Sequence, residues 1–591
     1  MTEAASRPSD NRSLRLERLR QLQRVPVLIV GGGINGISTF RELALQGIPV
    51  VMIEKGDWCQ GASGALSRMI HGGLRYLETG EFGLVRESVE ERDRLLKNAP
   101  HYVAPLRTTV PLDSWGGGII NAGKRFFRLS ETPSRRGALL VKTGLSLYDA
   151  YTRRYGSMPK HQLYNQQQTR QRWPELADWV RCSATYYDAQ IAAPERLGYE
   201  LIEDSERANA DALAINYMQL EESDGERLTL RDSLSGETFS LQPHVVVNAS
   251  GAWIDQLNAT LASGDRTLIG GTKGSHLIVR CPELLQALNG DMIYFENAEG
   301  RVCIMFPWYG NVLIGSTDIR VDDPETVVCE ADEKQYILDS LRFVFPRISV
   351  KDENVLYTFC GVRPLPASEA AISGRISRNH SLVIIAPDAR RDFTTLCLVG
   401  GKWTTFRKFG EQAADKVLNL LGERRKVSTG DLPIGGGHNY PSEQRKASWQ
   451  KQLSQQYQLS PARVSRLVSR YGTRAQQMMK FIIQAPDHSL HHQPDWTQRE
   501  LIWLMRHEQV CLPDDLVIRR TPLAMSGLLT RPLLEEIVDI MAVESGWSAT
   551  EKQQQLTQTL HRLAHQHGLA SLLSATPDRK PTHVNPAPPA D

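Results

Sequence analysis

Apolar residues form a short, unbroken run at 25–30, and a glycine-rich turn follows it directly. A run of this length between turn residues is typical of a strand that is buried on both faces. Residues 37–44 then continue with helix-compatible side chains, Gly47 ends that stretch, and residues 49–53 form a second apolar run. The pattern predicts a strand, a tight turn, a helix and a second strand, which together begin a Rossmann-type α/β domain.

Later apolar runs predict further strands and a second kind of sheet. Residues 244–251 form an apolar strand that ends in small residues, which suits a return to the first sheet. Residues 272–279, 303–308 and 312–318 are strands with turn signals between them, and they predict an antiparallel substrate domain inserted into the nucleotide-binding domain. Beyond about residue 430 the pattern becomes helical and polar, so we expect a separate all-α C-terminal domain.

These patterns divide the chain into successive segments. In order, they are an N-terminal tail at 1–24, a first part of the nucleotide-binding domain at 25–110, an excursion at 111–185 that faces the substrate or a membrane, a second nucleotide-binding part at 186–265, the substrate domain at 266–355, a third nucleotide-binding part at 356–428, the helical C-terminal domain at 429–573 and a proline-rich, disordered tail at 574–591.

The glycines of the first turn have the spacing of a dinucleotide-binding site. Gly31, Gly33 and Gly36 form G-x-G-x-x-G, which makes a tight turn, lets the backbone approach a pyrophosphate and packs the helix on the strand. The phosphate then lies at a helix N-terminus, where unpaired N–H groups point outward. Glu54 ends the second strand about twenty residues later, where the fingerprint places the carboxylate that binds a ribose hydroxyl. We therefore interpret the segment as a dinucleotide site rather than as a plain glycine-rich turn.

Composition and charge exclude several classes of protein. The 591 residues are too many for one ordinary core, and 69 Lys and Arg against 67 Asp and Glu give no field that recruits nucleic acid. The eight cysteines include no C-x-x-C pair, which argues against a disulfide framework, a zinc site and a redox dithiol, and favours a reducing cytoplasm. No apolar run reaches the length of about 18 residues that a membrane span needs, so we expect any membrane contact to be peripheral.

Two basic segments are candidates for such a contact. In residues 12–24 five arginines are interleaved with leucines, which fits an amphipathic helix on an anionic surface or, as the preferred interpretation, a loosely ordered tail. Residues 124–128 read Lys-Arg-Phe-Phe-Arg. Such a run either buries its rings in a lipid interface with its cations at the headgroups, or forms a solvated loop.

Residues with chemistry gather after the second predicted strand. The side chains at 61–67 are small and partly hydroxylated, which lets a backbone approach a bulky cofactor closely. His71, Arg75 and Tyr76 follow directly. The alternative interpretation of this stretch is a plain loop that enters the next helix.

A second group of candidates lies near residue 400. Gly400 and Gly401 end an apolar strand before a helix, where backbone N–H groups can face an anion or a polarised ring. Lys402 follows them, and Arg363 and Arg378 lie in segments that we expect to return to the same sheet. Their alternative role is that of ordinary surface or ion-pair cations.

Several of these segments resemble the FAD-dependent glycerol-3-phosphate dehydrogenases, the respiratory flavoproteins that oxidise glycerol 3-phosphate to dihydroxyacetone phosphate. The resemblance covers roughly residues 25–545 and includes the helical C-terminal domain. The segments that carry it are Gly31-Gly-Gly-Ile-Asn-Gly36, Ile70-His-Gly-Gly-Leu-Arg-Tyr-Leu-Glu78, Lys273-Gly-Ser-His276, Gly361-Val-Arg-Pro-Leu365 and Gly400-Gly-Lys-Trp-Thr-Thr-Phe-Arg-Lys408. The His-Gly-Gly-Leu-Arg-Tyr run is far more discriminating than the glycine fingerprint.

The resemblance implies a cofactor, a substrate and the residues that bind them. It implies that FAD is bound by Gly31, Gly33, Ile34, Asn35, Gly36, Glu54, Ser63, Ser67 and Gly401. It implies that glycerol 3-phosphate is bound by Arg75, Tyr76, Arg363, Arg378 and Lys402. His71 is the candidate base because the unperturbed pKa of imidazole lies near neutrality, whereas Arg363 is suited to orientation and charge stabilisation.

The resemblance also implies partners and a location. It implies a quinone as electron acceptor, a cytoplasmic protein attached peripherally to the cytoplasmic membrane, and no nucleic acid partner; a homodimer is one option for its assembly. Three alternatives stay open: an oxidase that delivers electrons to oxygen, an amino-acid oxidase, and a flavin-binding scaffold without turnover. The cluster of cations suits a phosphate better than a zwitterion.

Overall fold

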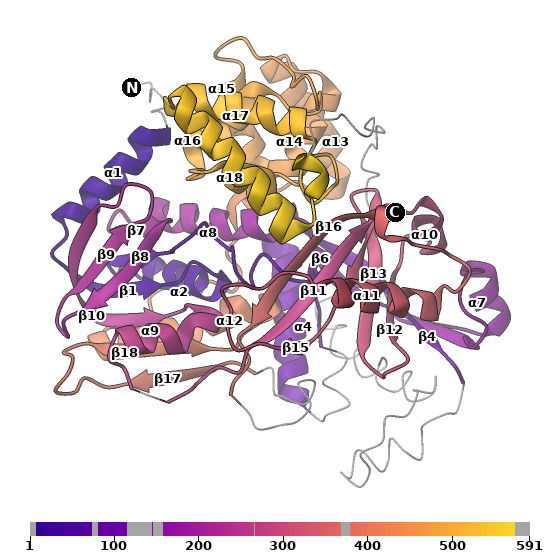
Figure 1. Cartoon of the computed structure of the whole chain (residues 1–591), viewed down its shortest axis with the longest axis horizontal. Helices are drawn as coiled ribbons and strands as arrows, with labels where there is room; N and C mark the ends of the chain where they lie inside the picture. The colour runs from indigo at the N-terminus through magenta and orange to yellow at the C-terminus, as the bar shows by residue number, and fades with distance from the viewer. Residues whose placement is uncertain are drawn as a thin grey trace, which may run out of the picture.

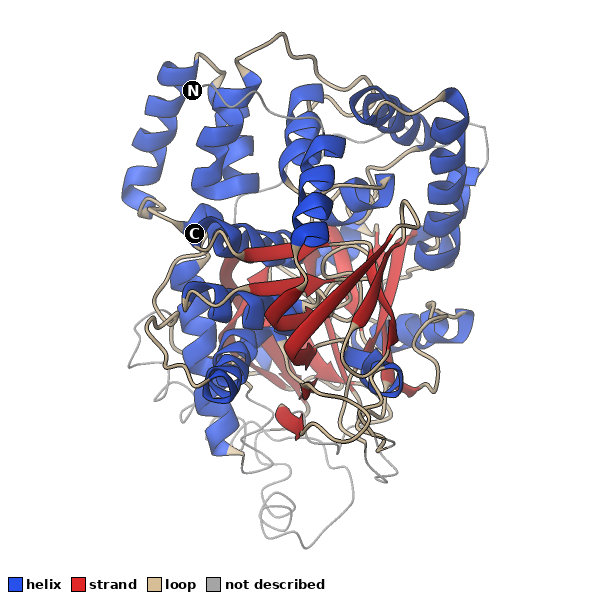
Figure 2. Cartoon of the chain, turned by 90° about the vertical axis from the view of Figure 1, so that its left-hand side faces the viewer, coloured by secondary structure: helices blue, strands red, loops and turns tan. Residues whose placement is uncertain are grey.

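The computed structural model describes residues 8–73, 81–114, 145, 158–264, 266–367 and 379–573. In these ranges the chain forms two sheets, with the helices of the C-terminal domain above them (Figure 1). In the view turned by 90° the strands lie at the centre, and helices lie above and beside them (Figure 2). The α/β fold class with an all-α C-terminal domain, expected from the sequence, is confirmed.

The first sheet contains the nucleotide-binding strands and is largely parallel. Its path is β17-β18-β10-β1-β2-β7, in which only β17 runs antiparallel to its neighbour, and the hairpin β8-β9 extends antiparallel from β10. The strands are β1 Arg24–Val30, β2 Val50–Ile53, β7 Ala212–Ile215, β8 Met218–Ser223, β9 Leu228–Asp232, β10 Thr238–Asn248, β17 Ser381–Ile385 and β18 Thr394–Val399.

Alternate side chains of β1 enter different cores, which explains its unbroken apolar sequence. Val27 and Ile29 pack in one core with α2, α8 and α12, whereas Leu28 and Val30 pack in another with the β8-β9 hairpin. Both faces of this parallel strand are therefore covered, as such sheets require. The three helices are α2 Ile34–Leu45, α8 Pro194–Ala208 and α12 Phe406–Leu421.

The second sheet includes the strands of the segment that we expected to form the substrate domain. Its path is β15-β11-β14-β13-β12-β4-β6-β3, with β16 beside β11 and β5 beside β6. The strands are β3 Met69–Ile70, β4 Val103–Leu112, β5 Gln162–Tyr164, β6 Cys182–Ile191, β11 Thr272–Val279, β12 Met292–Glu296, β13 Val302–Trp308, β14 Asn311–Gly315, β15 Ile319–Arg320 and β16 Val355–Arg363. The helices around both sheets also include α4 Phe82–Asn98, α7 Gln166–Arg172, α9 Ile254–Thr260, α10 Pro282–Ala287 and α11 Ala331–Val344.

Three strands of this sheet differ from the domain boundaries expected from the sequence. We expected β4, β6 and β16 to lie largely in the nucleotide-binding parts at 25–110, 186–265 and 356–428. Instead β4 pairs with β6 along its whole length, and β16 pairs with β11. The pairing joins segments that are far apart in the sequence, and local periodicity carries no information about strand partners.

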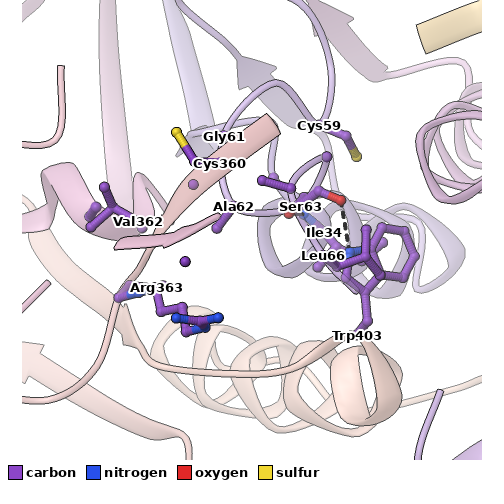
Figure 3. A pocket seen from close by; sticks show the side chains of 18 of the residues that line it. Ile34, Cys59, Gly61, Ala62, Ser63, Leu66, Cys360, Val362, Arg363 and Trp403 are labelled. Carbon is purple, nitrogen blue, oxygen red and sulfur yellow. Dashed lines mark hydrogen bonds between the residues drawn. The ribbon is translucent and has the colours of Figure 1, made fainter. Parts of the chain in front are cut away.

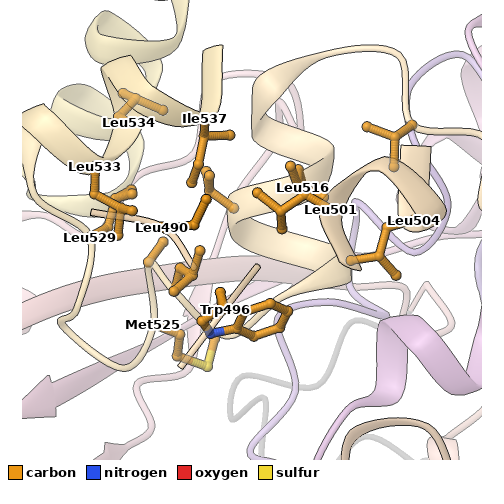
Figure 4. Close-up of a cluster of buried hydrophobic side chains, with 14 of the residues drawn as sticks. Leu490, Trp496, Leu501, Leu504, Leu516, Met525, Leu529, Leu533, Leu534 and Ile537 are labelled. Atoms are coloured by element: carbon orange, nitrogen blue, oxygen red, sulfur yellow. The ribbon is translucent and has the colours of Figure 1, made fainter. Parts of the chain in front are cut away.

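The C-terminal helices share their core with the second sheet. Leu501, Leu516 and Leu534 (Figure 4) belong to one buried cluster that also contains Phe306 and Tyr357 of the sheet. The helical domain that we expected to be separate is therefore packed onto the substrate domain. Its elements are α13 Glu443–Tyr457, α14 Pro461–Tyr471, α15 Ala475–Ile482, α16 Gln498–His507, the π-helical segment η7 Asp515–Arg520, α17 Arg531–Ser545 and α18 Ala549–His567.

The segment that we expected to be a loosely ordered tail forms helix α1, Pro8–Gln21. Arg12 donates a hydrogen bond to Asp232 at 2.6 Å, and Asn11 donates one to the carbonyl of Arg506 at 3.2 Å. The helix therefore connects the first sheet with the C-terminal domain. Carboxylates or carbonyls of the chain also accept hydrogen bonds from Arg15, Arg18 and Arg20. These bonds involve the same arginines that the alternative interpretation placed on an anionic membrane surface. The sequence does not predict the bonds, because the acceptors lie far along the chain.

Candidate active site

A cavity of about 2700 Å³ lies between the two sheets and the C-terminal domain. Its wall includes the glycine turn after β1, the loop that follows β2, the adjoining parts of β11 and β16, and the turn before α12 (Figure 3). Residues of η7 and α18 in the helical domain also line it. Segments that are far apart in the sequence thus form one site.

The glycine turn brings several backbone segments into close contact. Gly31 has a φ of 118°, and a Cβ at this position would overlap the backbone of Ala249. A Cβ on Gly36 would overlap the carbonyl oxygen of Gly31, so α2 packs directly against the end of β1. Gly33 is the N-cap of α2 and lines the cavity. The cavity therefore faces a helix N-terminus, where an anion is stabilised.

Glu54 follows β2 and is held beside the glycine turn. Its Oε2 accepts a hydrogen bond from the N–H of Gly32 at 2.7 Å, and its Oε1 accepts one from the N–H of Gly56 at 2.9 Å. Burial raises the pKa of Glu54, and the two N–H donors oppose that shift. The carboxylate lines the cavity, where a ribose hydroxyl can donate to it.

The loop that contains Ser63 lies against the N-terminus of α2. Ser63 Oγ accepts a hydrogen bond from the N–H of Ile34 at 2.9 Å. The carbonyl of Ser63 accepts one from the indole N–H of Trp403 at 2.9 Å, and Figure 3 shows the two residues facing each other. The loop therefore joins the turns before α2 and α12, and its small side chains leave backbone at the cavity wall.

Asn35 forms a second link between these two turns. Its Nδ2 donates to the carbonyl of Gly400 at 3.0 Å. Gly400 and Gly401 have φ values of 79° and 100°, which glycine adopts without strain, and a Cβ on Gly401 would overlap the Asn35 amide. The turn before α12 can approach Asn35 of α2 this closely because residue 401 has no Cβ.

Unpaired polar atoms in the wall fit a bound dinucleotide. Asn35 Oδ1 and Thr404 Oγ1 are buried and have no hydrogen-bond partner among the described residues, and both residues line the cavity. A buried polar atom without a partner costs about 1–3 kcal/mol, and a ligand that bonds to it removes that cost. With the glycine turn and Glu54, these groups fit FAD.

Arg363, at the end of β16, reaches the cavity across β11. Its Nη1 donates to the carbonyl of Thr317 at 3.2 Å and lies 3.3 Å from the carboxylate of Asp318, and its Nη2 donates to Ser316 Oγ at 3.0 Å. A Cβ on Gly274 would overlap the guanidinium, so that glycine makes room for it. These hydrogen bonds fix the side chain, and its exposure of 25% keeps it accessible.

His276 is a candidate to which the sequence assigned no role. It is buried on β11, and its Nε2 lies 2.7 Å from Ser67 Oγ. Burial and the positive charges of Arg363 and Arg68 lower the pKa of His276 to about 3, so the imidazole is neutral at pH 7. The signal that pointed to it was the Lys-Gly-Ser-His motif, which we noted only as part of the resemblance.

His71 and Lys402 line the same cavity. The N–H of Gly72, next to His71, donates to Asp188 at 2.8 Å. Lys402 lies near α4, where its Nζ is 3.5 Å from Ser88 Oγ. The cavity therefore joins both residues with Arg363 and the glycine turn. Four further candidates lie outside the described residues, so their roles stay predictions: Arg75, Tyr76, Arg378 and the basic run 124–128.

Comparison with known proteins places the chain in a family. A family model described as FAD dependent oxidoreductase matches residues 26–407, and one described as the C-terminal domain of alpha-glycerophosphate oxidase matches residues 427–552. A glycerol-3-phosphate dehydrogenase of Synechocystis sp. is 32% identical, with 84% of this chain and 89% of the relative covered. The chain belongs to the FAD-dependent glycerol-3-phosphate dehydrogenase family. Its cofactor is FAD.

Two further comparisons add to this finding. A D-erythritol 1-phosphate dehydrogenase of Brucella abortus is 27% identical, with 84% of this chain and 92% of the relative covered. The solved structure of the glycerol-3-phosphate dehydrogenase from Bacillus halodurans, complexed with FAD, is similar with a TM-score of 0.72 at 22% identity, covering 94% of this chain and 97% of that one. The similarity in fold to that structure thus extends over nearly the whole length of this family member.

In this member of the glycerol-3-phosphate dehydrogenase family, a buried ionic cluster anchors the loop that follows β2 to the helical domain. Asp57, three residues after Glu54, accepts hydrogen bonds from Arg520 at 2.7 and 2.9 Å and from Arg519 at 2.5 Å. Burial acts to raise the pKa of Asp57, but the two guanidinium groups hold it well below its usual range. Arg519 also binds Asp515 at 2.7 Å. The two arginine partners of Asp57 lie more than 460 positions away, which is why the sequence did not reveal them.

Proposed function

We propose that this protein oxidises sn-glycerol 3-phosphate to dihydroxyacetone phosphate and passes the electrons to a quinone. The observation that carries the proposal is one cavity lined by Arg363, Lys402, His71, His276 and the glycine turn. Bound FAD supplies the acceptor for the hydride that leaves the substrate carbon. The relatives named above include dehydrogenases of two different polyol phosphates, which supports a phosphorylated polyol as the substrate class.

The cations of the cavity bind and orient the phosphate in this proposal. A phosphate monoester carries nearly two negative charges, and a guanidinium can bind it with two parallel hydrogen bonds. Arg363 is held by Ser316, Thr317 and Asp318, so less conformational freedom is lost when the substrate binds. Lys402 adds a second positive charge.

The reaction also needs a group that accepts the hydroxyl proton. We propose His276 in place of His71, because His276 is neutral and lies beside Ser67. The negative charge of a bound phosphate opposes the effect of Arg363 and raises the pKa of His276 towards the range of a good general base. His276→Gln should therefore slow anaerobic flavin reduction by about 100-fold or more, and His71→Gln should slow it less. The reverse order would assign the proton to His71.

The electron acceptor decides between a dehydrogenase and an oxidase. We expect a soluble quinone analogue to be reduced in step with glycerol 3-phosphate oxidation, and hydrogen peroxide to carry only a small part of the electrons. Both products can be measured in one air-equilibrated reaction. The match to a domain named for alpha-glycerophosphate oxidase favours the oxidase as the second candidate, and one peroxide formed per substrate oxidised would establish it.

A quinone acceptor implies contact with a membrane surface. Among the described residues, no helix is long and apolar enough to cross a membrane. The arginines of α1 bind groups of the protein, so residues 124–128 become the main candidate for peripheral contact. The protein should sediment with anionic liposomes at low salt, and its failure to do so would remove this part of the proposal.

A further inference from the structure

The turn 316–318, which holds Arg363, is itself held by a buried network. Thr317 is only 3% exposed, and while its carbonyl accepts a hydrogen bond from Arg363, its Oγ1 accepts one from the N–H of Ser275 at 2.9 Å. The turn is thus attached to β11 on one side and to the guanidinium on the other. Whatever fixes Thr317 therefore also fixes the position of Arg363.

Glu333 of α11 is the centre of this network. Its Oε1 accepts hydrogen bonds from Thr317 Oγ1 at 2.7 Å and from Ser275 Oγ at 2.8 Å. Its Oε2 lies 2.7 Å from Lys273 Nζ and accepts a hydrogen bond from the N–H of Glu330 at 3.0 Å. Glu333 is 2% exposed, so its carboxylate is surrounded by these partners rather than by water.

Lys273 supplies the positive charge that a buried carboxylate needs. Its side chain is 8% exposed, and its Nζ also donates to the carbonyl of Val328 at 3.0 Å. Burial acts to lower the pKa of Lys273, but the hydrogen bond and the negative charge of Glu333 raise it. A buried ion pair persists only when further hydrogen bonds satisfy both partners, and that condition is met here.

We propose that Glu333 is a positioning residue of the substrate site, which acts on Arg363 through Thr317 and Ser275. The inference rests on the proposed role of Arg363 in binding the phosphate. It also gives the Lys273-Gly-Ser-His276 motif a common purpose. The lysine and the serine of the motif bind Glu333, its glycine leaves room for the guanidinium, and its histidine lies next to the same charge.

Glu333→Gln tests this link, with Asp339→Asn as a matched control. Asp339 lies on the same helix, and its exposed carboxylate binds Arg342. Its replacement should therefore change nothing at the substrate site. In the crystal structure of Glu333→Gln, with FAD bound, we expect Arg363 to have lost at least one of its bonds to the turn 316–318. We expect kcat/KM for glycerol 3-phosphate to fall roughly ten- to hundred-fold, because a misplacement of about 1 Å has effects of this size.

A double-mutant cycle separates positioning from general destabilisation. If Glu333 acts through Arg363, Glu333→Gln should cause little further loss of kcat/KM once Arg363 is alanine. Gly274→Ala provides a second route, because its methyl group displaces the guanidinium without touching Glu333. It should reduce kcat/KM while leaving FAD content and melting temperature close to those of the wild type.

The possible outcomes distinguish this inference from the proposed function. If Arg363 keeps all its bonds in Glu333→Gln and kcat/KM is unchanged, or if the two losses multiply in the double variant, Glu333 is not a positioning residue. If Arg363 moves in the crystal structure but the oxidation of glycerol 3-phosphate is unaffected, the positioning role holds and the proposed role of Arg363 is wrong.

Discussion

Arg363→Ala is expected to lower kcat/KM for sn-glycerol 3-phosphate by roughly ten- to hundred-fold or more. Each charge-assisted hydrogen bond to a phosphate contributes on the order of 1.5–3 kcal/mol, and every 1.4 kcal/mol corresponds to about a factor of ten. FAD content should barely change, because the turn at Gly31 and the carboxylate of Glu54 form a different part of the cavity. The measurement is steady-state kinetics with glycerol 3-phosphate and with glycerol.

Two further variants sharpen this prediction. Arg363→Lys keeps the charge but loses the planar fork, so it should recover only part of the loss. Arg342→Ala removes an exposed arginine that binds Asp339 on α11, and it should leave the kinetics unchanged. If Arg363→Ala reduces the efficiency with glycerol by the same factor as with glycerol 3-phosphate, Arg363 does not bind the phosphate.

Asp57→Ala is expected to lower the free energy of unfolding by about 3–5 kcal/mol and to weaken FAD binding. The substitution removes the carboxylate that the buried Arg519 and Arg520 share, so that of these two arginines only Arg519 stays hydrogen-bonded to a carboxylate, that of Asp515. It also releases the loop that carries Glu54, which is joined to the glycine turn by the hydrogen bond from the N–H of Cys59 to the carbonyl of Gly32. Urea unfolding and the FAD retained after dialysis measure the two effects.

An exposed ion pair provides the control for Asp57. Asp431 binds Lys97 at 2.9 Å with a side chain that is 78% exposed, so Asp431→Ala should cost less than about 1 kcal/mol. Asp57→Asn keeps the shape of the side chain and should fall between the two. If Asp57→Ala unfolds at the same urea concentration as the control and retains its FAD, the buried cluster does not anchor the cofactor loop.

The features that the sequence revealed are local ones. The turn at Gly31 and the approach of Gly401 depend on residues that lack a Cβ, and spacing alone exposes such positions. Spacing also revealed Glu54, because this residue lies at a fixed distance from the turn along one βαβ unit. Each of these predictions needed only a short stretch of chain.

The features that the sequence did not reveal depend on partners far along the chain. No motif in the sequence points to Asp57, because its partners Arg519 and Arg520 lie in another domain. The arginines of α1 looked available for a membrane because the carboxylates and carbonyls that bind them belong to strands much further along. Likewise, the proposed role of His276 depends on the contact between β11 and Ser67, and periodicity does not predict which segments are in contact.

The most direct test of the central claim is anaerobic mixing of the purified protein with sn-glycerol 3-phosphate. We expect the visible absorbance of the bound oxidised flavin to disappear, with one dihydroxyacetone phosphate formed for each FAD, whereas glycerol and amino acids leave the spectrum unchanged. A protein that contains its full complement of FAD but keeps an unaltered spectrum with glycerol 3-phosphate would contradict the proposed function.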